Sequence, residues 1–227
     1  NGVIIITTKK GRKGLQISYN GSTTISTKKK LIDVLSADQY REFITKLYGV
    51  GSDAYKALGT ANTNWQEEIY RTAVSHDHNL TIGGQMGDWL PYRISGGYTG
   101  QQGILKTSSF DRFTTALNLS PSLLNKHLNI NLSLKGLYAK SRYADAAAVG
   151  AAVYMDPTQS VYDNTSPNAF GGYFQWKTSS NYNNPKWGPY EFNNIATRNP
   201  VSILDLKNDI AHSREFIGSA DLDYQVH

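Results

Sequence analysis

Cysteine is absent from the 227 residues of the chain. Disulfide-linked scaffolds and zinc sites built on cysteine thiolates are therefore excluded for it. Long hydrophobic runs are also missing, because the longest nearly apolar stretch, Ala146 to Met155, is half of the ~20 residues that a membrane-spanning helix needs. The chain begins without methionine and without a basic, then apolar leader, so we expect no signal peptide in it.

A strong charge of one sign is missing as well. Lysine and arginine number 23 and aspartate and glutamate 18, which gives a net charge of only +5. The densest basic run is Lys28 to Lys30, which is typical of a solvated strand end. Because a nucleic-acid-binding protein normally has a larger basic patch, we expect no nucleic-acid partner.

What the chain does have is tyrosine, glycine and a repeated alternation of apolar and polar residues. Leu15, Ile17 and Tyr19 are apolar. Gln16 and Ser18 between them are polar. This period of two gives a strand one apolar and one polar face. The same pattern predicts six strands, near residues 15–27, 76–86, 90–100, 110–120, 127–143 and 212–227.

The lengths of strands and connections favour a membrane protein over a soluble β-sandwich, which would alternate in the same way. The fifth segment keeps its period for about a dozen residues, against about 5–6 in an ordinary strand. Residues 28–75 and 144–211 are long connections, whereas those before residues 90 and 127 are short. Outer-membrane barrels have long outer loops and short periplasmic turns. We therefore predict an all-β fold, an antiparallel portion of a transmembrane β-barrel, open because incomplete, with short helices in its long outer loops.

Tyrosines near the predicted strand ends fit the aromatic girdles of such barrels. They are Tyr92, Tyr98, Tyr138 and Tyr143. The alternative is that they are ordinary strand residues, because tyrosine is common in strands generally.

Helix-capping residues mark three helices in the long connections. Ser36 and Gln39 form a capping-box pattern at the start of a helix that ends at Gly49. Thr63 or Asn64 precedes a second, short helix. Residues 199–204 begin a third, with asparagine as its cap and proline in its first turn.

Residues 156–198 are dense in Asn, Gly, Pro and aromatic residues, and we expect an irregular loop there. Aromatic rings stack on sugars and anchor protein interfaces, so this loop is our candidate for contact with a substrate or partner. The alternative is that the rings pack the loop onto itself. The candidate residues are Tyr173, Phe174, Trp176, Trp187 and Tyr190.

Two groups of polar side chains are candidates for chemical sites. His76 and His78 lie on one side of an extended segment, but the sequence places no third metal ligand beside them. Asp221 and Asp223 share the polar face of the last strand, where they are alternate residues rather than a catalytic pair. No nucleophile elbow or phosphate loop is present, so we expect no enzyme, no metal and no cofactor.

Five segments in the same order resemble SusC/RagA-type TonB-dependent outer-membrane transporters. The opening "NGVIIITTKKGRKG" is similar to the end of that family's plug domain. Two segments resemble that family's early barrel strands, "ISGGYTGQQGILKTSSFDRFTTALNLSPSL" and "NINLSLKGLYAKSRYAD". Two others resemble parts of a long outer loop, "GAAVYMDPTQSVY" and "NPVSIL". These segments cover nearly the whole chain but correspond only to the end of the plug and the first part of the barrel. We therefore expect the chain to be a fragment of such a transporter.

The resemblance implies a division of the chain. Residues 1–10 would be the last strand of the plug domain, 11–14 a linker, and 15–227 the N-terminal portion of the barrel. The junction between plug and barrel would be formed by Val3, Ile4, Ile5, Ile6, Lys9, Lys10 and Gly11.

The resemblance also implies a function and partners. The function would be TonB-dependent import of oligosaccharides or peptides across the outer membrane of a Bacteroidetes-like Gram-negative cell. The partners would be a SusD-like surface lipoprotein, outer-membrane lipid, and the TonB complex through a segment that this chain lacks. The alternative from the residues alone is a soluble β-rich carbohydrate-binding or adhesin module.

Overall fold

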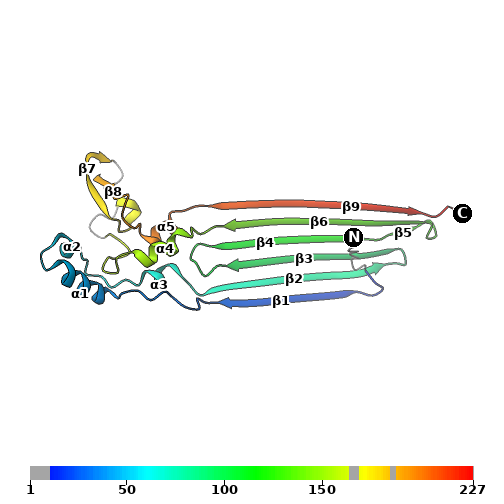
Figure 1. Ribbon diagram of the computed structural model, residues 1–227. Coiled ribbons are helices and arrows are strands. Elements are labelled where there is room, and N and C mark those ends of the chain that lie inside the picture. Colours follow the sequence, from blue (N-terminus) through cyan, green and yellow to red (C-terminus); the bar gives the residue numbers. More distant parts are fainter. Residues whose placement is uncertain (1–10, 164–168, 185–187, 227) are drawn as a thin grey trace, which may run out of the picture.

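Six long strands form one antiparallel sheet in the computed structural model, which describes residues 11–163, 169–184 and 188–226 (Figure 1). The strands are β1 (Gln16–Ser26), β2 (Ala73–Met86), β3 (Leu90–Gln102), β4 (Ser109–Leu119), β6 (Leu128–Arg142) and β9 (Ile210–Tyr224). Their order in the sheet is the order in the chain, with β1 and β9 at the edges. The expected antiparallel open sheet of six strands is thereby confirmed, and we call it the main sheet.

The strand register aligns residues of one kind across the main sheet. Ile82 on β2 is opposite Ile17 on β1 and Ile94 on β3. Leu117 on β4 is opposite Ile94 and Leu134. Since side chains alternate between the two faces, these rows form one apolar face. The residues between them, such as Ser18, Thr81, Ser95 and Ser133, form the opposite, polar face.

Short connections lie at one end of the main sheet. Residues 87–89 join β2 to β3, and residues 120–127 join β4 to β6. The second connection contains β5 (Ser122–Leu123), which pairs with the start of β6. Leu124, Asn125 and Lys126 have positive φ angles of 53°, 52° and 74°, which reverse the chain within a few residues. The C-terminus lies at this same end (Figure 1).

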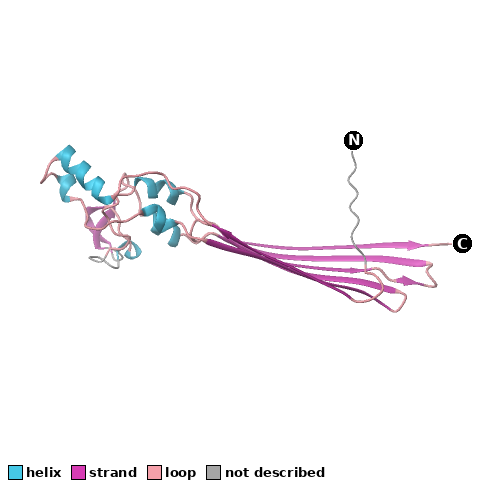
Figure 2. Cartoon of the chain, turned by 90° about the horizontal axis from the view of Figure 1, so that it is seen from below, coloured by secondary structure: helices cyan, strands magenta, loops and turns pink. Residues whose placement is uncertain are grey.

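The opposite end holds all the helices of the described residues, in what we call the loop cluster, residues 27–72, 103–108 and 143–209 (Figures 1 and 2). Its helices are α1 (Ala37–Tyr48), α2 (Asp53–Lys56), α3 (Trp65–Ile69), α4 (Ala147–Tyr154), α5 (Pro200–Asp205) and the 3-10 turn η1 (Ala169–Gly172). A two-stranded sheet of β7 (Lys177–Asn184) and β8 (Gly188–Phe192) completes it. No helix in the described part of the chain is long and apolar enough to cross a membrane.

The capping residues predicted from the sequence are confirmed. Ser36 and Gln39 form both hydrogen bonds of the capping box at α1. Asn64 caps α3, and the Asn199 side chain accepts hydrogen bonds from two backbone N–H groups at the start of α5.

One expectation for the loop cluster needs correction, and one of its helices was not predicted. The stretch 156–198 is not irregular throughout, because it contains η1, β7 and β8. The run from Ala146 to Met155, considered only as too short for a membrane span, forms α4. The expected plug strand, residues 1–10, lies outside the described residues.

Candidate functional site

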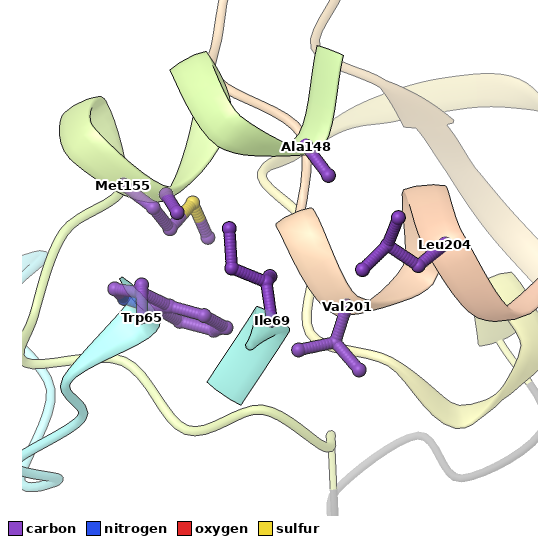
Figure 3. Packing of buried hydrophobic residues seen from close by; sticks show 7 residues of the cluster. Trp65, Ile69, Ala148, Met155, Val201 and Leu204 are labelled. Carbon is purple, nitrogen blue, oxygen red and sulfur yellow. The ribbon is translucent and has the colours of Figure 1, made fainter. Parts of the chain in front are cut away.

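The loop cluster has a hydrophobic core made from three helices distant in sequence (Figure 3). Trp65 and Ile69 of α3 pack with side chains of α4 and α5, and Ile69 and Leu204 are 0% and 1% exposed. The Trp65 indole N–H also donates a 2.8 Å hydrogen bond to the backbone carbonyl of Asp156. The remaining members of the core are Ala148, Ala152, Met155 and Val201. This core holds the two long connections together as one folded unit.

A buried polar cluster after α4 fixes residues 57–63 to the other long connection. Asp156 Oδ1 accepts hydrogen bonds from the backbone N–H and the hydroxyl of Thr158, both at 2.7 Å. The Thr158 hydroxyl accepts from the Gly59 N–H at 2.9 Å. The Gln159 amide donates to the carbonyl of Ala57 at 2.9 Å. Because buried polar groups are costly when unpaired, these bonds favour a single arrangement of the two connections.

A second buried polar cluster surrounds Asn199. Its amide nitrogen donates to the carbonyls of Val161 and Phe174, at 2.8 and 3.1 Å. Its backbone N–H donates to the Gln175 side chain at 3.0 Å, and Gln175 in turn donates to Ser202 at 2.7 Å. The residue that caps α5 therefore also fixes the aromatic segment beside it.

The structure brings three of the five candidate aromatic residues together beside this cluster. Phe174 and Trp176 are in edge contact, with ring centroids 5.2 Å apart, and both pack partly buried against the core. Tyr173 contacts Tyr162 at 5.3 Å and donates a 2.8 Å hydrogen bond to Asp205. Burial raises the pKa of Tyr173 to about 12, and the bond to Asp205 adds to the shift.

The other two candidates are less defined. Tyr190 lies in β8, opposite Ser179 of β7, and Trp187 lies outside the described residues. The inward packing of Phe174 and Trp176 is what a loop that packs on itself requires. Contact of the five residues with a substrate or partner stays a prediction.

A groove of about 780 Å³, which no local sequence pattern predicts, lies between α1, α3 and α4. Its wall includes Tyr40, whose pKa is raised by burial and further by the Asp156 carboxylate. It also includes Tyr154, which is 80% exposed. Polar groups of Gln39 and Asn62 face the same space. The criterion that selected residues 173–190, tryptophan and tyrosine in a long connection, also fits Trp65 and Tyr154. It does not predict that these two residues lie close together, because their proximity depends on the tertiary fold.

Gly11 is the only candidate junction residue among those the structure describes. A Cβ atom at this position would lie 2.3 and 2.4 Å from the carbonyl oxygens of Tyr92 and Gly84. Since such distances are far inside van der Waals contact, only glycine fits here without movement of the backbone. The entry of the chain into the main sheet therefore packs directly on β2 and β3. Val3, Ile4, Ile5, Ile6, Lys9 and Lys10 lie outside the described residues.

The two polar pairs considered as chemical sites, His76 with His78 and Asp221 with Asp223, lie on opposite faces of the main sheet. His76 and His78 lie on the apolar face with ring centroids 5.5 Å apart, and His78 Nδ1 lies 2.6 Å from the Tyr19 hydroxyl. Asp221 and Asp223 are opposite Asn131 and Asn129 of β6, on the polar face. Within the described ranges, no group of three or more His, Cys, Asp or Glu residues could hold a metal ion.

Comparisons with known proteins identify relatives over the whole chain. No family model matches it. The TonB-dependent receptor SusC of Bacteroides thetaiotaomicron is 49% identical over 233 aligned residues, which cover 100% of this chain and 23% of that protein. The TonB-dependent receptor P3 of Formosa agariphila is 34% identical over 140 residues, which cover 60% of this chain and 13% of the relative. The chain thus spans less than a quarter of the length of either relative.

A solved structure has a similar fold. The structure described as that of the RagAB peptide transporter aligns with a TM-score of 0.51 and 18% identity, over 69% of this chain and 22% of the other. At this identity the match is evidence for the fold alone. The relatives found by sequence are named as receptors, in agreement with the expectation that the chain is not an enzyme.

Proposed function

Because the chain belongs to the SusC/RagA type of TonB-dependent receptors, we propose that it forms the first part of the barrel wall of an outer-membrane nutrient importer. The proposed activity of the whole protein is TonB-dependent import of oligosaccharides or peptides. The proposed location is the outer membrane of a Gram-negative, Bacteroidetes-like cell.

The apolar face of the main sheet is the observation that carries this proposal. Its large side chains are open to the surroundings: Ile17 is 64% exposed, Phe216 74% and Leu222 70%. A continuous apolar surface of this extent is unusual on a water-soluble protein and is typical of membrane or protein contact. In the described residues no second layer covers it, whereas a soluble β-sandwich needs one. The alternative of a soluble binding module is therefore disfavoured.

The lengths of the strands and the two unequal ends agree with a membrane-spanning wall. The six long strands have 11 to 15 residues, and a tilted transmembrane strand needs about 9–11. The loop cluster would face the outside of the cell and the short turns the periplasm. In this arrangement residues 1–10 are the last plug strand, 11–14 the linker and 15–227 barrel wall with its outer loops, and the packing of Gly11 at the short-turn end supports a plug that joins from the periplasmic side.

The proposed partners follow the same arrangement. A SusD-like surface lipoprotein would contact the loop cluster, and the TonB complex would act through a segment preceding this chain. The groove between α1, α3 and α4 and the aromatic segment 173–190 offer surfaces for the lipoprotein or for an oligosaccharide or peptide.

Transport by the full-length receptor tests this proposal. We expect a disruption mutant to lose growth on one class of oligosaccharide or peptide, and the purified receptor to migrate differently in detergent gels before and after heating, as folded barrels do. Loss of growth on no such nutrient, or migration unaffected by heat, would contradict it.

Alanine variants of the aromatic residues test the loop contact separately. If Trp176 and Trp187 contact the substrate or partner, Trp176→Ala and Trp187→Ala reduce uptake while the barrel still folds. Trp89→Ala is the matched control, because Trp89 lies in the short turn between β2 and β3 at the opposite end. Uptake that is the same in all three variants would remove these residues from the site.

A further inference from the structure

Every Asp, Glu, Lys or Arg side chain on the apolar face of the six long strands lies at the end next to the loop cluster. By strand register, these residues are Asp111 on β4, Lys140 and Arg142 on β6, and Arg214 on β9. Three of the four are positive, and they lie on adjacent strands. The same face at the short-turn end carries no Asp, Glu, Lys or Arg on these strands, as Tyr92, Leu119, Leu132 and Tyr224 illustrate.

A row of aromatic side chains borders the aliphatic part of the face. Arg214 lies in this row, opposite Tyr138, and the other three charges lie beyond it. Phe113 on β4 is opposite Tyr98 and Tyr138, and the Tyr98 and Phe113 ring centroids are 4.6 Å apart. The Tyr138 hydroxyl lies 3.0 Å from Nδ1 of His212. The Arg214 guanidinium lies over the Tyr138 ring at 5.8 Å. Aromatic side chains of this kind occupy the boundary between hydrocarbon and headgroups in membrane proteins.

The three positive side chains lack an acidic partner among the described residues. None of Lys140, Arg142 and Arg214 has a carboxylate within salt-bridge distance. Asp111 is opposite Lys140, but its Oδ1 accepts a 2.9 Å hydrogen bond from the Tyr98 hydroxyl instead. In the same described part, Nε of Arg142 is buried without a hydrogen-bond partner. These three residues, which we call the basic patch, leave donors available for an anion.

We propose that the basic patch binds the phosphate group of lipopolysaccharide in the outer leaflet of the outer membrane. This inference rests on the proposed function, which places the loop-cluster end of the main sheet at the cell surface. The lipid chains lie along the aliphatic rows below Tyr138, and the phosphate lies at the level of Lys140. Basic residues at the level of an aromatic row and just beyond it match an anionic headgroup in both charge and depth. The absence of such residues at the short-turn end makes the site specific to the outer leaflet.

The full-length receptor in lipid nanodiscs provides the test. Nanodiscs of phosphatidylethanolamine containing a small fraction of monophosphorylated lipid A are incubated with the receptor, and retained lipid A is counted by native mass spectrometry. We expect wild type to retain lipid A and the triple variant Lys140→Gln, Arg142→Gln, Arg214→Gln to bind it about a hundredfold more weakly, since each basic residue near an anionic lipid surface contributes roughly fivefold. Dephosphorylated lipid A should not be retained, and inorganic phosphate should not compete.

Matched variants separate the patch from general effects of charge and folding. Lys135→Gln removes a positive charge from the same strand but from the polar face, and it should leave lipid A retention unchanged. The charge-conserving variant Lys140→Arg, Arg142→Lys, Arg214→Lys should retain most of the binding. Wild-type retention by the glutamine triple variant, or equal retention of phosphatidylglycerol by wild type, overturns the proposal. Heat-dependent migration is measured for wild type and for every variant. Its absence in wild type contradicts the proposed function rather than the lipid site.

Discussion

The main sheet and the loop cluster treat their apolar side chains in opposite ways. In the loop cluster, Trp65, Ile69 and Leu204 are at most 2% exposed and contact one another across three helices. In the main sheet, Ile94 is 49% exposed and Phe113 52% exposed, although both belong to long, fully paired strands. Figure 2 shows the same contrast in shape, with a thin extended sheet joined to a compact group of helices.

This difference separates two sources of stability. The loop cluster supplies its own core, so its stability depends on packing within the chain. The main sheet supplies backbone hydrogen bonds but leaves its apolar side chains for an apolar environment. Substitutions in the two regions should therefore respond differently to the surroundings of the protein, and all of them are made in full-length receptor.

The largest effect is expected from Trp65→Ala in the loop cluster. It removes the central ring of the core and leaves the Asp156 carbonyl without the indole N–H, at a cost of about 3–5 kcal/mol. Hydrogen exchange of the Ala61 and Thr63 amides, which bond to carbonyls of 157–158, should become much faster. Trp89→Ala in the short turn serves as the control. Unchanged protection at both amides would mean that the loop cluster does not depend on this core.

An adjacent pair on β6 tests the two faces of the main sheet. Leu134 is on the apolar face, opposite Leu117, and Ser133 is on the polar face, opposite Asn118 and Ser219. Leu134→Arg should make folding into a bilayer less favourable by about 2–4 kcal/mol, because the charge enters hydrocarbon. Ser133→Arg should change it by less than about 1 kcal/mol, as polar-face substitutions usually do. Equilibrium folding into vesicles from denaturant measures both, and equal effects would contradict the assignment of faces.

Removal of the Asn199 side chain tests how the aromatic segment is fixed. Asn199→Ala loses the cap of α5 and the two bonds to the carbonyls of Val161 and Phe174, and we expect a loss of about 2 kcal/mol. Asn199→Ser keeps an oxygen that can cap α5 but not the amide donors, so its effect should be smaller. Exchange rates of the Val201 and Ser202 amides report the loss. Serine as damaging as alanine would show that the cap itself contributes little.

The smallest effect is a pH dependence from Tyr173. Its pKa is raised to about 12 in the folded protein, above the ordinary value of 10.0. The folded state therefore holds this proton more tightly than the unfolded state, so the contribution is complete below pH 10 and is lost as pH rises toward 12. Tyr173→Phe should flatten the decline in loop-cluster stability across this range. A decline of the same size in the variant would assign it to other groups.

Local patterns predicted the parts of the fold that are local in origin. Alternation identified the six long strands because most of the large apolar residues in them face the same side. The pattern Ser36 and Gln39 predicted the start of α1 because both partners of a capping box are three residues apart.

The parts that were missed lack such local signals. The sequence of β7, KTSSNYNN, has no alternation of apolar and polar residues. Helix α4 is apolar on all sides, and its N-cap residue, Ala146, makes no side-chain capping hydrogen bond. The core joins α3 to α4, which begins 78 residues after α3 ends, and to α5, which begins 131 residues after it. The groove beside Tyr40 exists only because of that association. No spacing within one segment encodes these contacts.

Site-directed spin labelling of β3 tests the central claim most directly. The chain contains no cysteine, so a single cysteine placed at each of residues 92–99 in turn, in full-length receptor without other cysteines, carries one label. In bilayers we predict that labels at the even positions, which share the apolar face with Tyr92, Ile94 and Tyr98, collide preferentially with oxygen. Labels at the odd positions, which include Arg93, Ser95 and Thr99, should collide preferentially with a water-soluble nickel complex. A profile without this period of two, or with the two faces reversed, would contradict a main sheet whose apolar face contacts lipid.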